Sequence, residues 1–310
     1  MRARKEGEAD MARPRKSTVK VAIPALVAAA VGVVAFSAAW PGAQQSAQSA
    51  QQRPGAATGQ QAAQARSGDP EDPATWKLPI ETYLPTRAQA RLVAGSRDAL
   101  LDTCMADAGY PAWTPAPDLP EIGGKTLTDW RYGIHDAALA AQRGYHPDAA
   151  EQSAYDAAME AGAVDESGAD DGVLRGCVSE VDGQVPATTA KAALVQQISG
   201  DAFVQSEEAP AVVAVFAQWS SCMKDKGYAY AKPMDASDDP RFNDPDTVTG
   251  TEIVTATADI ECRDKYHVEK TWFDAEAALQ QAAIAQHQAE LDQVKADTGR
   301  IVARAEAAAH

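Results

Sequence analysis

The stretch Cys104-Met105-Ala106-Asp107-Ala108-Gly109-Tyr110 occurs a second time, as Cys222-Met223-Lys224-Asp225-Lys226-Gly227-Tyr228. Five of the seven positions are identical, and the two copies lie 118 residues apart. Each copy ends a run of helically spaced apolar residues, and its glycine suits the left-handed position just past a helix C-terminus. A further cysteine follows each copy, Cys177 after the first and Cys262 after the second. The repeat therefore predicts two related helical modules, each containing a helix that ends in a cysteine.

The cysteines favour disulfide bonds. They are four in number, and none belongs to a Cys-x-x-Cys pair, so the zinc-ribbon and thioredoxin patterns are absent. With the export signal described below, disulfides are favoured over metal ligands or a catalytic nucleophile. The repeat favours the pairs Cys104–Cys177 and Cys222–Cys262, each contributing about 4 kcal/mol through loop-closure entropy. The crossed pairing of Cys104 with Cys222 and Cys177 with Cys262 stays open if the modules share one core.

Three segments of different composition precede the expected globular part. Residues 1–20 are basic, with seven Lys or Arg and three acidic side chains, and either Met1 or Met11 is the true start. Residues 21–40 carry no charge and as a helix would reach about 30 Å, the hydrocarbon thickness of a bilayer. Residues 41–76 are rich in Gln, Ala and Pro, which predicts a disordered tether.

The uncharged segment 21–40 has two interpretations. As a single-pass transmembrane helix it would keep the basic residues 1–20 in the cytoplasm and place the body outside, by the positive-inside rule. As a signal peptide it would be cut near the small residues Ser37 and Ala39, and the body would be secreted. The length of the segment favours the membrane helix. Both interpretations place residues 41–310 outside the cytoplasmic membrane.

The composition favours a mainly α-helical fold. Aromatic residues make up only 6% of the chain and alanine is abundant, which suits closely packed helices better than a sheet sandwich. We therefore expect a disulfide-linked helical domain with few short extended segments. Its first module should span residues 77–207. Its second should span residues 208–310 and end in a long C-terminal helix.

Local signals predict several helix ends. Thr86 and Gln89 form a capping-box pattern, and Asp136 is a candidate N-cap of a short helix. The acidic, proline-containing stretch 231–249 should be a loop. After Gly250 the pattern is almost continuously helical, and the last ten residues should fray.

The charge balance makes nucleic acid an unsuitable partner. The chain carries a net charge of −16 at pH 7, of which residues 1–20 contribute +4, so residues 21–310 carry −20. An acidic body repels phosphate backbones. The abundant charges otherwise predict a solvated surface.

No standard motif for catalysis, cofactor binding or metal binding is found. Gly123-Gly124-Lys125-Thr126 resembles the end of a phosphate-binding loop, but Leu119 stands where the first glycine belongs. None of the five histidines lies four residues from another or from a cysteine, so no local metal site is predicted. We expect no catalytic residue, no cofactor and no metal. If the protein is a hydrolase, its carboxylates should lie within or near residues 118–148.

Several motifs of the body carry a resemblance to known proteins. They are Leu78-Pro79-Ile80-Glu81-Thr82-Tyr83-Leu84, Cys104-Met105, Arg131-Tyr132-Gly133-Ile134, Gly144-Tyr145-His146, Trp219-Ser220-Ser221-Cys222-Met223-Lys224 and Glu252-Ile253-Val254-Thr255-Ala256-Thr257-Ala258-Asp259-Ile260-Glu261-Cys262. Over about residues 78–295 the chain resembles a group of exported or membrane-anchored proteins of Streptomyces-like actinobacteria. The group has no established activity, so the resemblance implies a location but no reaction. No lipobox cysteine follows residues 21–40, and membrane attachment would therefore depend on that segment.

These observations predict a non-enzymatic protein of the cell envelope, tethered to the cytoplasmic membrane through residues 21–40. Its body would bind an envelope protein or a cell-wall component through helical faces. One alternative is a cell-wall hydrolase that uses carboxylates. Another, motivated by the resemblance, is an accessory subunit of an export or efflux complex that docks through the long C-terminal helix.

Overall fold

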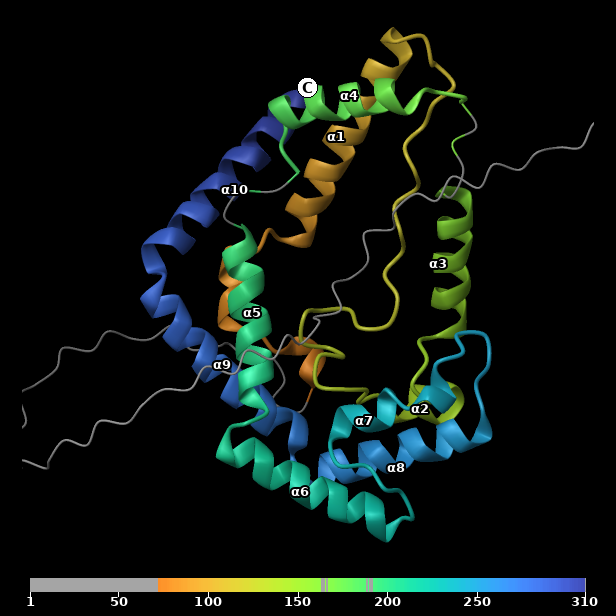
Figure 1. Cartoon of the computed structure of the whole chain (residues 1–310), viewed down its shortest axis with the longest axis vertical. Helices are drawn as coiled ribbons and strands as arrows, with labels where there is room; N and C mark the ends of the chain where they lie inside the picture. Colours follow the sequence, from red (N-terminus) through yellow and green to blue (C-terminus); the bar gives the residue numbers. More distant parts are fainter. Residues whose placement is uncertain (1–71, 163–164, 166, 188, 190–191, 310) are drawn as a thin grey trace, which may run out of the picture. The chain divides into compact units, whose positions relative to one another are not determined.

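The computed structural model describes residues 72–162, 165, 167–187, 189 and 192–309 (Figure 1). These residues are mainly helical and contain no strand, so the predicted helical class is confirmed. The basic segment, the transmembrane or signal segment and residues 41–71 of the tether lie outside the described residues. Within the described ranges, no helix is both long enough and apolar enough to cross a bilayer.

The described residues belong to one compact unit, which contains ten α-helices and three short 3-10 helices. In chain order the elements are η1 (Pro73–Thr75), η2 (Pro79–Tyr83), α1 (Arg87–Asp107), α2 (Ala137–Arg143), α3 (Ala149–Gly162), α4 (Asp171–Gln184), α5 (Ala192–Ser206), α6 (Pro210–Asp225), α7 (Pro233–Ser237), η3 (Pro240–Phe242), α8 (Gly250–Tyr266), α9 (Val268–Gln286) and α10 (Gln288–Ala308).

The two copies of the repeat end α1 and α6 in the same way. Gly109 and Gly227 have φ values of 97° and 96°, which a side chain would disfavour. The backbone N–H of the following tyrosine donates to the carbonyl of the buried methionine, at 2.9 Å from Tyr110 to Met105 and at 2.9 Å from Tyr228 to Met223. The predicted glycine stops are therefore present in both helices.

The predicted starts of the early helices are also confirmed. Thr86 caps α1, where its hydroxyl accepts from the backbone N–H of Gln89 and the Gln89 side chain accepts from Thr86 N–H. Asp136 caps α2 by accepting from two backbone N–H groups. In both places a local side-chain contact satisfies amides that have no partner within the helix.

The main core forms where α5, α6 and α9 meet η2. Trp272 of α9 stacks on Phe203 with ring centroids 4.9 Å apart, and it meets the edge of Phe216 at 5.0 Å. The indole N–H of Trp272 donates to Ser206 Oγ at 2.7 Å, so its polar atom is satisfied inside the core. Because these residues come from both predicted modules, residues 77–207 and 208–310 share a core.

Both disulfide bonds have the pairing that the repeat predicts. Cys222 of α6 is bonded to Cys262 of α8 within the main core, with a Cα–Cα distance of 5.9 Å. Cys104 of α1 is bonded to Cys177 of α4, with a Cα–Cα distance of 5.7 Å. A separate small cluster that includes Met105 packs around this second bond. The connection between α4 and α1 therefore depends on fewer apolar contacts than the main core.

The C-terminal part is almost continuously helical after Gly250, as predicted. It consists of α8, α9 and α10, with breaks at His267, which has a φ of 51°, and at His287. The final residues are not frayed, because α10 packs along α1 and buries Val302 and Ala305 (Figure 1). This packing uses the apolar face that a partner helix would need.

Two other boundaries need correction. Residues 72–76, assigned to the tether, are folded: they include η1, and the Trp76 side chain lies in the main core. The stretch 231–249 contains α7 and η3, each of which begins with a proline. Proline suits these first positions because its missing N–H has no helical partner there.

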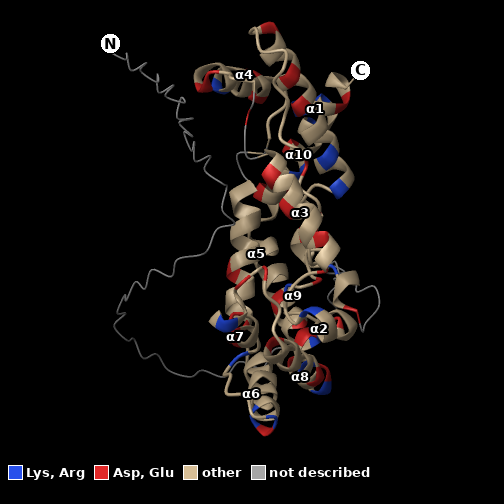
Figure 2. Ribbon diagram, turned by 90° about the vertical axis from the view of Figure 1, so that its right-hand side faces the viewer, with Lys and Arg blue, Asp and Glu red and all other residues tan. Residues whose placement is uncertain are grey.

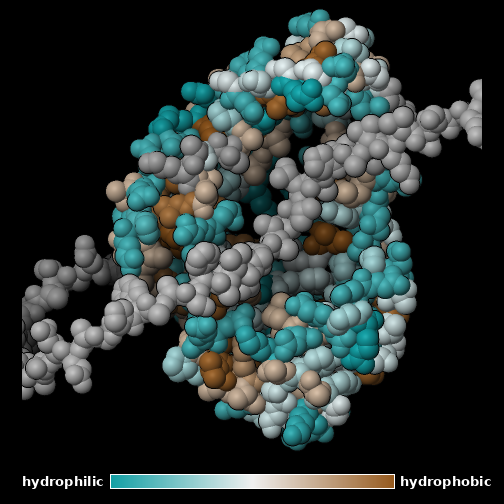
Figure 3. All heavy atoms as spheres, viewed as in Figure 1, coloured by the Kyte–Doolittle hydropathy of each residue, from teal (hydrophilic) through white to brown (hydrophobic). Residues whose placement is uncertain are grey.

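The exposed surface agrees with a solvated, charged protein. Acidic residues occur on most of the labelled helices and do not collect on one of them (Figure 2). The face drawn in Figure 3 is largely hydrophilic, and its hydrophobic residues form small separate groups. Helix α3 stands apart from the core and buries none of its side chains.

Candidate binding site

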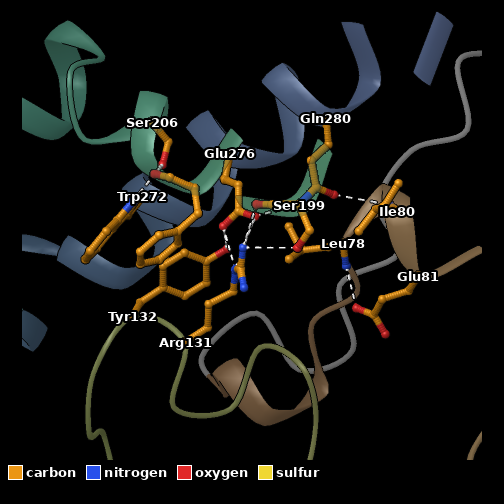
Figure 4. Close-up of polar contacts among 11 residues, drawn as sticks. Leu78, Ile80, Glu81, Arg131, Tyr132, Ser199, Ser206, Trp272, Glu276 and Gln280 are labelled. Carbon is orange, nitrogen blue, oxygen red and sulfur yellow. Dashed lines mark hydrogen bonds and ion pairs between the residues drawn. The ribbon is translucent and has the colours of Figure 1, made fainter. Parts of the chain in front are cut away.

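A buried carboxylate on α9 organises the centre of the domain (Figure 4). Glu276 is fully buried and accepts from the Arg131 guanidinium at 2.7 and 2.8 Å, in a bidentate ion pair. It also accepts from the Tyr132 hydroxyl at 2.8 Å and from the Gln280 amide at 2.6 Å. Arg131 donates in addition to the backbone carbonyl of Ser199 on α5, at 3.0 Å. The Glu276 carboxylate on α9 is therefore linked through Arg131 to the segment before α2 and to α5.

The same network holds η2 in place. Gln280 Oε1 accepts from the backbone N–H of Ile80 at 3.1 Å, and this bond is buried (Figure 4). The Glu81 carboxylate accepts from Leu78 N–H at 2.7 Å. The motif at residues 78–84, which carried part of the resemblance, is thus fixed to α9 by polar contacts. Buried and satisfied networks of this kind make the surrounding backbone rigid.

A second buried ion pair lies on α8. Arg263 donates to Asp259 at 2.6 Å, one helical turn away, and also to the backbone carbonyls of Tyr132 and Pro233. Asp259 accepts in addition from the Trp219 indole N–H at 2.8 Å. The Arg263 guanidinium lies so close to Gly133 that a Cβ there would overlap it, and Gly133 has a φ of 118°. This explains why glycine occupies position 133.

A third buried carboxylate pairs with a histidine. Glu252 Oε1 lies 2.7 Å from His146 Nδ1 and accepts from Tyr145 N–H at 2.9 Å. The other ring nitrogen of His146 lies 2.9 Å from the backbone carbonyl of Asp244. These contacts connect the segment after α2 to the start of α8. The Gly144-Tyr145-His146 motif is therefore part of a structural network.

Glu269, at the start of α9, is the least satisfied of the buried charged groups. Its Oε1 is buried and has no hydrogen-bond partner among the described residues. Burial raises the pKa of Glu269 to about 8. The Arg263 charge opposes this increase, and Asp264 and Asp259 add to it. The carboxyl group is therefore largely protonated at neutral pH.

The Gly-Gly-Lys-Thr stretch binds carboxylates of its own chain. Gly123 N–H donates to Glu151 Oε2 at 3.1 Å, and Lys125 N–H donates to Asp129 Oδ2 at 2.5 Å. The Lys125 ammonium also pairs with Glu151. Two of the backbone amides that a phosphate could use, and the lysine of the stretch, are therefore already paired with carboxylates.

Four of the five acidic side chains of residues 118–148 make contacts that stabilise the fold. Asp129 Oδ1 lies 2.6 Å from His135 Nε2, and Glu121 pairs with Arg87 at 2.7 Å. Asp136 caps α2, and Asp148 accepts from two amides at the start of α3. The structure therefore gives each of these four carboxylates a structural contact.

Two cavities share Tyr83 and Leu84, which line both of them. The larger, here called the wide cavity, has a volume of about 1090 Å³ and lies between η2, the start of α1 and the junction of α9 with α10. The smaller, here called the apolar cavity, has a volume of about 530 Å³ and lies between α1, α5 and α10. Both are as large as typical ligand sites, which have volumes of roughly 300–1,000 Å³.

The turn that carries these shared lining residues is held by identifiable contacts. Tyr83 is buried, and its hydroxyl accepts from the Gln288 amide at 3.0 Å. The preceding turn is fixed by Gln280, which is itself held by Glu276. Neither Glu276 nor Gln280 lines a cavity. Through Ile80 they hold the turn that carries Tyr83 and Leu84.

The sequence patterns predicted the disulfides but not the cavities or the buried charges. Five charged residues on α8 and α9 are buried: Glu252, Asp259, Arg263, Glu269 and Glu276. The spacing of Asp259 and Arg263, four residues apart on one helix, was an available signal for an ion pair. Spacing alone does not distinguish a buried pair from an exposed one. The two cavities involve residues about 200 positions apart and leave no local pattern.

Comparison with known proteins finds no significant similarity to a protein-family model, to a curated protein or to a solved structure. The function is therefore inferred from the chemistry of the site itself and not from fold analogy.

Proposed function

We propose that the described helical domain is an extracytoplasmic binding domain of the cell envelope. In this proposal residues 21–40 hold the chain in the cytoplasmic membrane with its N-terminus inside. Secretion after cleavage of that segment is the alternative. The ligand is a cell-wall component or the exposed segment of an envelope protein. The resemblance to exported actinobacterial proteins also motivates this location.

The pair of cavities around Tyr83 and Leu84 is the observation that carries the proposal. A binding site needs a concave surface on a rigid base, so that little entropy is lost when the ligand is ordered. The Glu276 network supplies that base, and the two disulfides constrain the helices around it. Disulfides also persist in oxidising compartments, which supports a place outside the cytoplasm.

Filling the wide cavity tests the binding role. Ala88, an exposed residue of α1, lines this cavity, whereas the exposed Ala99 on the same helix lines neither cavity. We expect Ala88→Trp to weaken co-sedimentation of the full-length chain with purified cell walls or membrane vesicles of the source cells about tenfold or more. The matched Ala99→Trp variant should bind like the wild type. Equal binding by both variants would show that the wide cavity is not the site.

The same preparation tests whether the protein is a catalyst. Release of reducing sugars or free amino groups from the cell walls would refute a purely binding role. If Asp129→Asn abolished that release while keeping the melting temperature, the hydrolase alternative would replace the proposal. The location is tested by non-reducing peptide mapping of protein from cells, which reports the cysteine pairs and the mature N-terminus together.

A further inference from the structure

The apolar cavity has one charged region within a largely hydrocarbon wall. Apolar side chains of α1, α5 and α10, among them Val93, Val195 and Val302, supply most of its lining. Asp98 and its neighbour Arg97 line the same cavity. A ligand that fills this space must therefore combine an apolar body with one polar group.

The positive charge of Arg97 is already paired with a carboxylate of the protein. Its guanidinium pairs with Asp182 at 2.8 Å and donates to the backbone carbonyl of Val185. Asp98 is half-buried and accepts no hydrogen bond within the described part of the chain. Asp118 is near enough to act on it: burial and the Asp118 charge raise the pKa of Asp98, and Arg97 opposes them. Arg97 thus pairs with Asp182 and acts on Asp98, while Asp118 adds a negative charge near Asp98, and the region favours a cation.

We propose that the apolar cavity binds an organic amine, whose apolar ring or chain fills the cavity and whose ammonium group donates to Asp98. This inference rests on the proposed binding function and narrows its ligand class. An ammonium group would supply the hydrogen-bond donor that Asp98 lacks and would balance the negative potential from Asp118 and Asp182. An anionic ligand would be repelled by the carboxylates of Asp98, Asp118 and Asp182, and the Arg97 charge is already paired with Asp182.

A matched series of indoles tests the charge preference. Tryptamine, tryptophol and indole-3-acetate share one ring system and end in an ammonium, a hydroxyl and a carboxylate. We expect calorimetry or ligand-observed NMR with the full-length, disulfide-intact chain at neutral pH to show tryptamine binding about tenfold or more tighter than tryptophol. Indole-3-acetate should bind weakest.

Three variants test whether the preference for an ammonium group arises in the apolar cavity. Asp98→Asn should weaken tryptamine binding about tenfold and leave tryptophol within about twofold, since it removes only the charge. Asp102→Asn, on the exposed side of the same helix, should change neither affinity. Ala94→Trp should abolish binding of all three probes by filling the cavity, and circular dichroism should show that the variants are folded.

The outcomes separate this inference from the proposed function. Equal affinity for the three probes, or an unchanged tryptamine affinity in Asp98→Asn, would overturn the amine preference. If Ala94→Trp still lost all three probes, the cavity would remain a binding site of another chemistry. Failure of every probe to bind would also overturn the inference. The proposed function would then be judged by the envelope experiment on Ala88→Trp, which concerns the other cavity.

Discussion

The buried Glu269 carboxyl group predicts how stability depends on pH, and Glu269→Gln tests it. The pKa of Glu269 is about 8 in the folded chain, mainly because of burial, against an ordinary value of 4.5. Between these two values the folded state holds one more proton than the unfolded state. The free energy of unfolding should therefore fall as the pH rises from about 4.5 to about 8. Glutamine cannot titrate, so the variant should lack this contribution.

The size of the effect follows from the shift. Each pKa unit corresponds to about 1.4 kcal/mol, so titration of Glu269 should cost the wild type on the order of 3 kcal/mol between pH 4.5 and pH 7. Relative to the wild type, Glu269→Gln should become progressively more stable over this interval. The nearby Arg263 and Asp259 charges affect the absolute value more than the direction of the trend.

Urea denaturation with the disulfides intact, repeated at several pH values between 4.5 and 8, measures this difference. The exposed Glu306→Gln on α10 is the matched control and should keep the wild-type slope, because it removes no buried group. A wild-type slope in Glu269→Gln would refute the argument. So would a variant that is less stable than the wild type at pH 7 by more than about 1 kcal/mol, since glutamine would then lack a contact that the carboxyl group makes.

Three further predictions concern the buried contacts. Gly133→Ala should destabilise the domain by roughly 2–4 kcal/mol in urea denaturation, because the new Cβ would overlap Arg263 and the backbone has a positive φ there. The control Gly299→Ala, which places its Cβ in open space on α10, should stabilise the domain by about 0.5–1 kcal/mol. Glu276→Gln should cost about 3–5 kcal/mol by leaving the buried Arg131 charge uncompensated, and adding Arg131→Met should restore part of that loss; a further drop would contradict this explanation. Replacing the Cys104–Cys177 pair by serines should raise hydrogen exchange in α4 while α9 stays protected, because α4 lies outside the main core; equal loss of protection in both helices would argue against a separate cluster.

Local patterns predicted the helices because their causes are local. The hydroxyl of Thr86 and the carboxylate of Asp136 satisfy amides two or three residues away, and glycine at 109 and 227 relieves the strain of a positive φ. Where a local prediction failed, a long-range contact is present. The last ten residues were expected to fray, yet α10 packs along α1 and buries Val302 and Ala305.

The pairing of the cysteines could also be predicted, because the duplicated stretch connects each helix end to a later cysteine in the same half of the chain. The repeat did not indicate that the two halves share one core. That sharing follows from aromatic packing around Trp272, whose partners on α5 and α6 come from both sides of the predicted module boundary.

The sequence by itself thus determined the helical class, most helix ends, the two disulfides and the acidic surface, all of which depend on neighbouring residues, composition or an internal repeat. Only the tertiary structure decided which charges are buried and where the cavities lie. Arg131 meets Glu276 across 145 residues, and Gln280 meets Ile80 across 200. Helical periodicity gives the face on which a side chain lies, but the element that covers that face is chosen by packing of the whole chain. A buried carboxylate and an exposed one therefore have the same local pattern and acquire different roles only when the helices assemble.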